Sequence, residues 1–283
     1  MRSTVAVASL LMTSLASAAH LPVHGHRGAR TILPENTIPG FEYAIRQGAD
    51  WIELDLWATR DNVLVVAHDA AMNPKICKGP VGETLIRKMT LAELKKWDCG
   101  ALGNPDFPQQ KAFPGTRVPT FDEVLALAKT PGFRFNVEVK SNPGHPEYAP
   151  PIDEYARMVV DAIRKHKLEQ RALVQSFDWR ILHATEKIAR ELPRSALFPT
   201  GKMDKDRDYV AVAKDANVRM VSVQYATVTS EKVKQAHAAG IKVIAWTANS
   251  ADVWDKLLQA KVDEIITDDP AALIDYLKTK NLR

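Results

Sequence analysis

Residues 242–267 read KVIAWTANSADVWDKLLQAKVDEIIT and contain one strand–helix–strand unit. An apolar run at Lys242–Trp246 precedes a helical pattern over Ala251–Gln259, and a second apolar run follows at Glu264–Thr267. Near-continuous apolar strands that alternate with helices are typical of parallel strands buried on both faces. This stretch therefore predicts an α/β fold built on a parallel sheet.

The same alternation extends over most of the chain. Short runs rich in β-branched residues predict six further strands, at Leu21–His26, Trp51–Trp57, Phe133–Lys140, Arg171–Ser176, Ser195–Phe198 and Arg219–Val223. Helical patterns are found at Thr37–Gln47, Ile152–Lys165, Trp179–Glu191, Ser230–Ala239 and Ala271–Lys278. Eight strand–helix units in a chain of 283 residues favour a (β/α)₈ TIM barrel over the alternative, a doubly wound open sheet.

One segment, residues 69–118, interrupts this alternation. It is rich in Pro and Gly, contains Cys77 and Cys99, and has only a short helical pattern at Leu91–Lys96. We expect it to be an insertion in the barrel domain that covers one end of the barrel, since a simple connection does not need this length. Two cysteines in an exported protein predict a disulfide that stabilises the fold by about 3 kcal/mol; two free thiols are the alternative.

Residues 1–18 have the order of a secretory signal peptide. Arg2 precedes an apolar run over Val5–Leu15, and the segment ends in Ala16-Ser17-Ala18, a small-x-small cleavage site. The alternative, a membrane anchor, needs about 20 apolar residues, more than this run supplies. We therefore expect an exported protein, periplasmic or extracellular, with a single barrel domain over residues 19–283.

The charged residues are balanced and dispersed. Lys and Arg number 38 against 34 Asp and Glu, a net charge of +4, without a basic run. This pattern gives no support to nucleic-acid binding, and no later stretch is apolar enough for membrane insertion. Neither the charge distribution nor the apolar pattern indicates an oligomeric state.

Acidic residues gather where predicted strands end, which is the functional face of a TIM barrel. Glu53 and Asp55 are two residues apart and share a face of their strand, as do Glu138 and Lys140 on the next barrel strand. Three converging carboxylates are tolerated when they bind a cation, and oxygen ligands suit Ca²⁺, Mg²⁺ or Mn²⁺. The sequence therefore predicts one divalent metal ion at Glu53, Asp55 and Glu138, with ordinary ion pairs as the alternative.

Two histidines are expected beside this cluster. His26 ends the first predicted strand. Residues 57–67 read as a hairpin, and a two-residue turn at Asp61-Asn62 pairs Arg60 with Val63 and places His68 opposite Asp55. Two histidines that titrate near neutral pH can serve as general acid and base.

Two basic residues, Arg27 and Lys140, are predicted at the same end of the barrel. Arg suits the planar recognition of a phosphate, and Lys supplies a point charge. Together with a metal and two histidines they favour chemistry at an anionic phosphorus centre. A glycosidic bond fits less well, because glycosidases usually pair carboxylates without a metal.

The ordered series of motifs resembles the glycerophosphodiester phosphodiesterase family over nearly all of the mature chain. The motifs are His26-Arg27-Gly28, Pro34-Glu35-Asn36-Thr37, Glu53-Leu54-Asp55, His68-Asp69, Pro119-Thr120, Glu138-Val139-Lys140, Trp246-Thr247-Ala248-Asn249 and Thr267-Asp268-Asp269-Pro270. The inserted segment after His68-Asp69 is similar to that family's characteristic insertion.

The resemblance implies a TIM barrel that hydrolyses glycerophosphodiesters to sn-glycerol 3-phosphate and an alcohol such as choline or ethanolamine. It further implies roles for the singled-out residues: Glu53, Asp55 and Glu138 as ligands of one divalent cation, His26 and His68 as the acid/base pair, and Arg27 and Lys140 on the phosphate. We also expect Trp246 to line the glycerol or alcohol pocket, with a packed core tryptophan as the alternative, and Asn36 to cap the helix at Thr37–Gln47. Sphingomyelinase D-like phospholipases, which share this barrel, are the nearest alternative, and a non-catalytic phosphate-binding barrel is a second one.

Overall fold

A computed structural model describes residues 20–198 and 207–283, and the predicted signal peptide lies outside these residues. One sheet has the strand order β1-β9-β8-β7-β6-β5-β4-β2-β3, and β1 also pairs with β2. The sheet is therefore a closed barrel of parallel strands, with β3 added antiparallel to β2. This closure confirms the predicted TIM barrel and excludes the open sheet. The strands are β1 Val23–Gly25, β2 Trp51–Ala58, β3 Leu64–Val66, β4 Arg134–Val139, β5 Ala172–Ser176, β6 Arg194–Leu197, β7 Met220–Gln224, β8 Lys242–Trp246 and β9 Glu264–Thr267.

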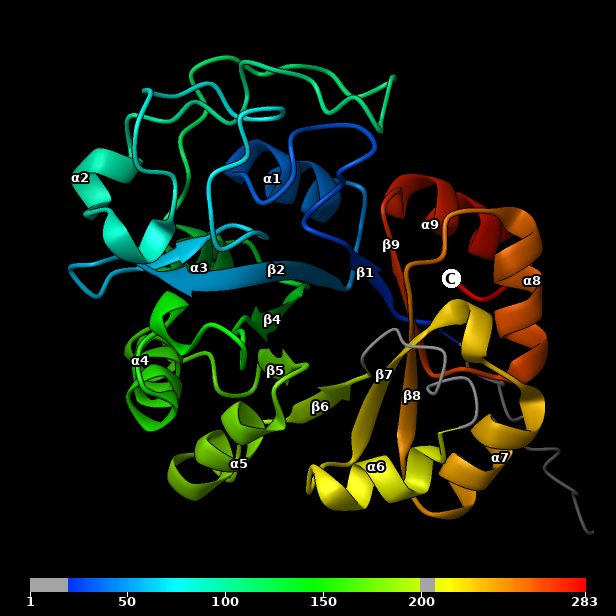
Figure 1. Ribbon diagram of the computed structural model, residues 1–283. Helices are drawn as coiled ribbons and strands as arrows, with labels where there is room; N and C mark the ends of the chain where they lie inside the picture. Colours follow the sequence, from blue (N-terminus) through cyan, green and yellow to red (C-terminus); the bar gives the residue numbers. More distant parts are fainter. Residues whose placement is uncertain (1–19, 199–206) are drawn as a thin grey trace, which may run out of the picture.

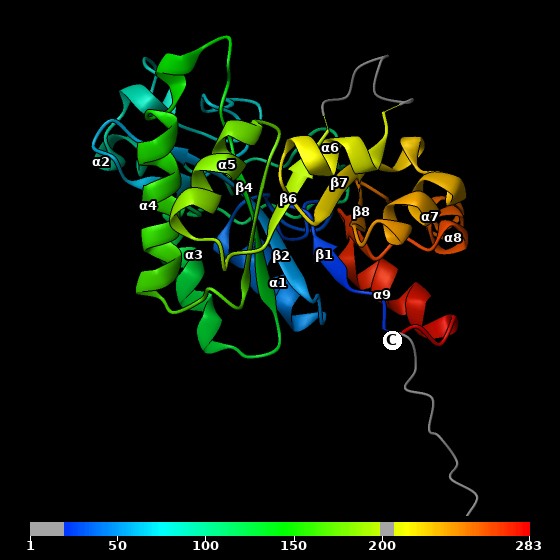
Figure 2. The same cartoon turned by 90° about the horizontal axis from the view of Figure 1, so that it is seen from below.

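Helices surround the barrel in both orientations shown in Figures 1 and 2. Among the described helices, none combines the length and the apolar composition that crossing a bilayer requires. The predicted helix at Ile152–Lys165 has the same bounds in the structure, where it is α4. Two helices, α3 at Phe121–Leu125 and α6 at Tyr209–Asp215, have no counterpart among the predicted helices. The helices are α1 Ile38–Arg46, α2 Leu91–Leu94, α3 Phe121–Leu125, α4 Ile152–Lys165, α5 Trp179–Ile188, α6 Tyr209–Asp215, α7 Ser230–Ala238, α8 Ala251–Ala260 and α9 Pro270–Thr279.

The two faces of β2 have different roles: one packs in the apolar core against the helices, and the other presents acidic side chains to the barrel interior. Ile52, Leu54 and Leu56 are fully buried in the apolar layer between strands and helices. Side chains alternate along a strand, so Glu53 and Asp55 point to the opposite face, inside the barrel. Below them Trp51, Leu173, Ile244 and Ile266 form an apolar cluster. His24 is buried beside this cluster and is paired with Glu264 and Asn136, so the deep interior is mixed in character and the carboxylates gather near the carboxyl end.

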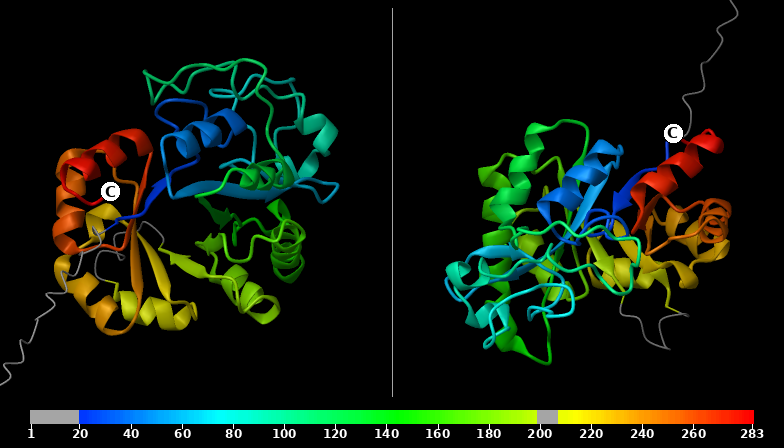
Figure 3. Two further views of the ribbon diagram at one scale, coloured as in Figure 1. Left: turned by 180° about the vertical axis from the view of Figure 1, so that it is seen from behind. Right: turned by 90° about the horizontal axis from the view of Figure 1, so that it is seen from above.

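The inserted segment is ordered and lies on one side of the barrel. Figure 3 shows it, coloured cyan to green, near α1 and away from α7 and α8. Its side chains Ile86, Leu94 and Trp97 belong to a second apolar cluster that also includes Trp57 and Val65 of the β2–β3 hairpin. The segment also contacts the β1–α1 loop, because Gln110 Nε2 donates to Arg30 O at 2.6 Å. The segment thus borders the carboxyl end of the barrel rather than closing it.

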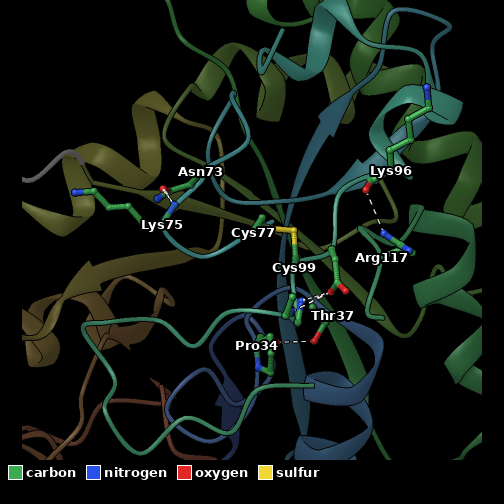
Figure 4. Close-up of a disulfide and its surroundings, with 11 residues drawn as sticks. Pro34, Thr37, Asn73, Lys75, Cys77, Lys96, Cys99 and Arg117 are labelled. Atoms are coloured by element: carbon green, nitrogen blue, oxygen red, sulfur yellow. Dashed lines mark hydrogen bonds between the residues drawn. A yellow bond between two sulfur atoms is a disulfide. The ribbon is translucent and has the colours of Figure 1, made fainter. Parts of the chain in front are cut away.

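A disulfide joins Cys77 and Cys99 within this segment, which confirms the predicted bridge. Figure 4 shows the bridge close to the turn at Pro34 and Thr37 that precedes α1. Pro34, Cys77 and Cys99 line one small, mostly apolar cavity that also includes His68. The disulfide therefore ties the segment together where it meets the rim of the barrel.

We expect Cys77→Ser/Cys99→Ser to lower the free energy of unfolding by about 3 kcal/mol, because the unfolded chain is no longer closed into a loop. Urea unfolding followed by circular dichroism measures this change. The exposed Val81→Ser is the matched control on the same segment and should leave the midpoint unchanged. A double variant as stable as the wild type would contradict the expectation.

The hairpin of β2 and β3 differs from the predicted register by one residue. Ala58 pairs with Leu64, and Ala67 N donates to Asp55 O at 3.0 Å, so His68 is not opposite Asp55. The turn has three residues rather than two, since Thr59 N donates to Val63 O and Asn62 adopts a left-handed conformation with φ 57°. His68 follows β3 as a loop residue, and this position brings it to the carboxyl end of the barrel.

Candidate active site

Three carboxylates meet inside the carboxyl end of the barrel, as the sequence predicts. Asp55 of β2 and Glu138 of β4 are direct partners in the parallel register, and Glu53 precedes Asp55 by two residues on the same face. One oxygen from each of the three side chains lies within 4.8 Å of the others, and all three residues are buried. This donor set has the chemistry of a site for a hard divalent cation.

Two basic side chains contact the cluster. Lys140 Nζ lies 2.7 Å from Glu138 Oε1 and 3.2 Å from Asp55 Oδ1. Arg27 Nε lies 3.4 Å from Asp55 Oδ2, while Arg27 Nη1 donates to Glu35 Oε1 at 2.8 Å. Arg27 therefore divides its charge between two acids. The predicted basic residues and the predicted metal ligands are thus in direct contact.

The pKa values of the three carboxyls respond to this environment in different directions. Burial opposes ionisation of Asp55, but Lys140 and the other cations around it hold its pKa below the ordinary value. Burial, Asp55 and Glu138 together raise the pKa of Glu53 well above its ordinary value. Burial also raises the pKa of Glu138, although Lys140 opposes the shift. Simultaneous ionisation of all three carboxyls is therefore unfavourable without a cation, and a bound cation would relieve the repulsion among them.

A tight turn after β1 positions Arg27. Arg27 has φ 50° and Gly28 has φ 93°, both in the left-handed region that few residues other than glycine adopt readily. A Cβ on Gly25 would lie 2.2 Å from Gly28 O, so the turn requires glycine at position 25. In this conformation Arg27 N donates to Glu53 Oε2 at 2.9 Å. The His26-Arg27-Gly28 motif therefore contributes a backbone N–H that binds Glu53, in addition to its side chains.

His26 is held by a carboxylate. Its Nδ1 lies 2.6 Å from Asp268 Oδ1, and Asn249 Nδ2 donates to Asp268 Oδ2 at 2.6 Å. Burial and Arg27 lower the pKa of His26, while Asp268 opposes the shift. Asp268 thus fixes the ring, and Nε2 remains the nitrogen available for chemistry.

His68 has a similar arrangement on the other side of the cluster. Its Nδ1 lies 2.7 Å from Asp69 Oδ1, and Trp57 Nε1 donates to the backbone oxygen of His68 at 3.0 Å. Its side chain is about one-third exposed, compared with 15% for His26. Each histidine thus has one ring nitrogen on a carboxylate, which is how general acid/base imidazoles are commonly oriented.

A cavity of about 350 Å³, the first cavity, brings these groups together. The predicted site residues His26, Arg27, Glu53, His68, Glu138, Lys140 and Trp246 all line it, and Asp55 lies behind them against Lys140. Trp246 packs edge-on against Phe177 with ring centroids 5.8 Å apart. The structure therefore collects the predicted residues at one site.

Asn36 does not have its predicted position as the cap of α1. Thr37 caps the helix instead, since its side-chain oxygen accepts from Gly40 N at 3.3 Å. Asn36 has φ 55° and donates from Nδ2 to Asp55 Oδ2 at 2.8 Å. The left-handed backbone takes Asn36 out of the capping position and turns it toward the carboxylate cluster.

Three further residues at the site were given no role by the sequence. Arg30 lies 3.6 Å from Asp268 and 3.4 Å from Glu35, and Gln175 Nε2 donates to Glu53 Oε1 at 3.3 Å. Asp268 and Gln175 are polar residues at strand ends, which is the signal that points to both, and Asp268 also belongs to the Thr267-Asp268-Asp269-Pro270 motif. Arg30 is a loop residue for which the sequence offers no signal.

Comparison with known proteins agrees with this geometry. The profile of the Glycerophosphoryl diester phosphodiesterase family matches residues 26–272. A glycerophosphodiester phosphodiesterase of Caldanaerobacter subterraneus is 33% identical over 256 residues, covering 90% of this chain and 97% of the relative. One of Bacillus subtilis is 30% identical over 256 residues, covering 87% of this chain and 82% of the relative.

Solved structures have the same fold. A Silicibacter pomeroyi protein provisionally named for the same activity superposes with a TM-score of 0.86 at 29% identity, covering 94% of this chain and 96% of that one. An Oleispira antarctica phosphodiesterase, solved with its product sn-glycerol-3-phosphate, has a TM-score of 0.74 at 24% identity, covering 91% and 96%. The chain therefore belongs to the glycerophosphoryl diester phosphodiesterase family and is an enzyme that hydrolyses glycerophosphodiesters.

Proposed function

We propose that the chain hydrolyses glycerophosphodiesters to sn-glycerol 3-phosphate and an alcohol in the first cavity, with one divalent cation held by Glu53, Asp55 and Glu138. The observation that carries the proposal is the buried carboxylate cluster in contact with Lys140 and Arg27. When bound, the cation supplies Lewis-acid stabilisation of charge on the phosphate. Ca²⁺, Mg²⁺ and Mn²⁺ all suit three carboxylate ligands.

Arg27 and Lys140 are proposed to bind the phosphate, because both border the first cavity beside the carboxylates. Their charge would stabilise the transition state more than the substrate, since negative charge accumulates on the phosphoryl oxygens during displacement. Trp246 would form an apolar wall for the glycerol or the alcohol. These three side chains would thus bind the substrate in the family's reaction.

His26 and His68 are proposed as the proton-transfer pair. One takes a proton from the attacking hydroxyl as its oxygen bonds to phosphorus. The other donates a proton to the alcohol oxygen as its bond to phosphorus breaks. If the attacker is water, sn-glycerol 3-phosphate forms directly; if it is the glycerol 2-hydroxyl, a cyclic phosphate forms and water then opens it to sn-glycerol 3-phosphate. The carboxylates of Asp268 and Asp69 on the Nδ1 atoms support this role, because they orient both rings.

The proposal is tested with glycerophosphocholine and the release of sn-glycerol 3-phosphate. We expect EDTA to abolish turnover and one of Mg²⁺, Ca²⁺ or Mn²⁺ to restore it. His26→Ala and His68→Ala should each lower kcat by about 10²- to 10⁴-fold. His237→Ala, on an exposed histidine of α7, is the matched control and should keep kcat. Full activity in EDTA, or in both site variants, would refute the assignment.

Sphingomyelinase D-like activity is not favoured, because the two relatives described above are named glycerophosphodiester phosphodiesterases and match this chain over most of their length. A sphingomyelin assay run in parallel with glycerophosphocholine separates the two activities.

We also propose that the protein is exported, as the predicted signal peptide indicates. The disulfide between Cys77 and Cys99 supports this, since such bonds persist in oxidising compartments. Expression of the full chain in a bacterial host, with fractionation and N-terminal sequencing, tests it. We expect a mature chain that begins near Ala19 outside the cytoplasm, and an uncleaved cytoplasmic chain would refute export.

A further inference from the structure

A second cavity of about 300 Å³ adjoins the first. The two share four lining residues, which form a common wall: His68, Glu138, Lys140 and Phe177. The proposed phosphate-binding Lys140 thus borders both spaces. A phosphodiester has two substituents, so a phosphate at this wall can direct one substituent into each cavity.

The two cavities differ in charge. Arg27, Arg30 and His26 line the first cavity and not the second. The second cavity is lined instead by Asp69 and Asp178, and Lys140 and His68 at the common wall are its basic groups among the described residues. Glu53 and Glu138 also line the first cavity, but the proposed divalent cation would offset their charge. With that cation bound, a positively charged head group would be repelled in the first cavity and attracted by the acids of the second.

The two acids of the second cavity are not equivalent. Asp178 is nearly buried and already satisfied, because Arg180 Nη2 and Ser141 Oγ donate to its Oδ2 at 2.7 and 2.6 Å. Asp69 is about half exposed, and His68 is its one ion-pair partner among the described residues. Asp69 is therefore the carboxylate that can attract a further cation.

Aromatic rings complete the second cavity. Trp57, Tyr148 and Phe177 line it, and Trp57 is buried while Phe177 is 38% exposed. Tyr148 is held in place by His145, whose ring stacks on it at 4.7 Å with the planes 7° apart. Aromatic side chains with a nearby carboxylate are the setting in which proteins bind ammonium groups.

We propose that the second cavity is the head-group subsite, and that it selects glycerophosphodiesters whose alcohol carries a cationic ammonium group, with Tyr148 and Asp69 as specificity-determining residues. This rests on the proposed function. The constant part of the substrate, glycerol 3-phosphate, then occupies the first cavity, with Arg27, Arg30 and the proposed cation. Most of the head-group subsite comes from the loops after β4 and β5, and the inserted segment, residues 69–118, contributes Asp69 and Ala70.

The test compares two substrates of almost equal shape: glycerophosphocholine and glycerophospho-3,3-dimethylbutanol, in which a carbon replaces the ammonium nitrogen. We expect wild-type kcat/KM to be about 3- to 30-fold higher for the choline ester, the range that cation–π contacts provide. In Tyr148→Leu, which keeps apolar bulk, the ratio should fall at least threefold. Inhibition by sn-glycerol 3-phosphate should not change, since that product occupies the other cavity.

The matched control is Tyr225→Leu. Like Tyr148, Tyr225 lies in a 3₁₀ turn after a barrel strand, but it is exposed and lines neither cavity. It should keep both kcat/KM values and their ratio. The ratio of the two kcat/KM values reports on head-group recognition even if Asp69→Asn or Tyr148→Leu lowers both rates. The ratio measured for the wild type tests the proposal without any variant.

The outcomes separate this inference from the proposed function. Equal kcat/KM for the two esters, or an unchanged ratio in Tyr148→Leu, would overturn the head-group assignment while hydrolysis stands. Failure to hydrolyse either ester with any of the three metals would overturn the proposed function itself.

Discussion

Glu53→Gln is expected to abolish turnover and at the same time to make the metal-free protein more stable. Burial and the neighbouring carboxylates raise the pKa of Glu53 well above its ordinary value, so its ionised form is unfavourable in the folded state. The amide removes this charge, and its oxygen can still accept from Arg27 N. It also removes one proposed ligand, and we expect kcat to fall by about 10³-fold or more.

The sign of the pH dependence follows from the same shift. A carboxyl whose pKa is raised by folding binds protons more tightly in the folded state, so it costs stability as the pH rises above its unfolded pKa. In EDTA, the wild type should therefore lose unfolding free energy above about pH 4.5 in part through Glu53. Glu53→Gln should lack that loss. Each kcal/mol recovered raises the melting temperature by about 2–4 °C.

Asp55→Asn provides the contrast on the same strand. The pKa of Asp55 lies below its ordinary value because Lys140 and Arg27 outweigh the effect of burial, so its charge is favourable in the folded state. Its neutralisation leaves both cations less well paired in a buried site and should destabilise the protein by about 3 kcal/mol or more. Scanning calorimetry in EDTA, with the exposed Glu42→Gln as control, measures both signs. Equal destabilisation by the two variants would argue against the electrostatic account.

The fold was predictable because its signals are local. β8 and β9 have their predicted bounds, since each short apolar run is buried on both faces and is bordered by polar residues that mark its ends. The convergence of Glu53, Asp55 and Glu138 was also predictable, because alternation along a strand and parallel pairing require nothing beyond residue spacing.

The parts of the site that sequence patterns missed depend on single backbone conformations. The left-handed residues Asn62 and Asn36 shift the hairpin register by one residue and move the cap of α1 to Thr37. Neither conformation is required by a neighbouring residue type. The contact of His26 with Asp268 joins residues 242 positions apart, so it exists only after the barrel closes through β1 and β9.

Asp268→Asn is expected to lower kcat by about 10- to 10³-fold and to reveal which proton-transfer role His26 has. Asp268 binds Nδ1 of His26 at 2.6 Å and does not line the first cavity, so we assign it as a positioning residue. The asparagine keeps the shape and a hydrogen-bonding group but loses the charge that stabilises an imidazolium. Loss of a carboxylate partner from an imidazole costs rate because ring orientation and tautomer are no longer fixed.

The direction of the accompanying pKa change is determined by the groups around His26. Burial and Arg27 already lower the pKa of His26, and Asp268 opposes them, so Asp268→Asn lowers the pKa further. If His26 is the general base, the acidic limb of the kcat/KM profile moves to lower pH, because the base remains unprotonated at lower pH. If His26 is the general acid, the alkaline limb moves to lower pH, because the acid loses its proton earlier.

Asp69→Asn, which changes the partner of His68, is the matched variant and should leave the limb that belongs to His26 in place. Full pH–rate profiles of the wild type and the two variants, with metal held at saturation, therefore assign the acid and the base by which limb each variant moves. A profile of Asp268→Asn that matches the wild type in both limbs and in kcat would show that Asp268 does not position a catalytic histidine.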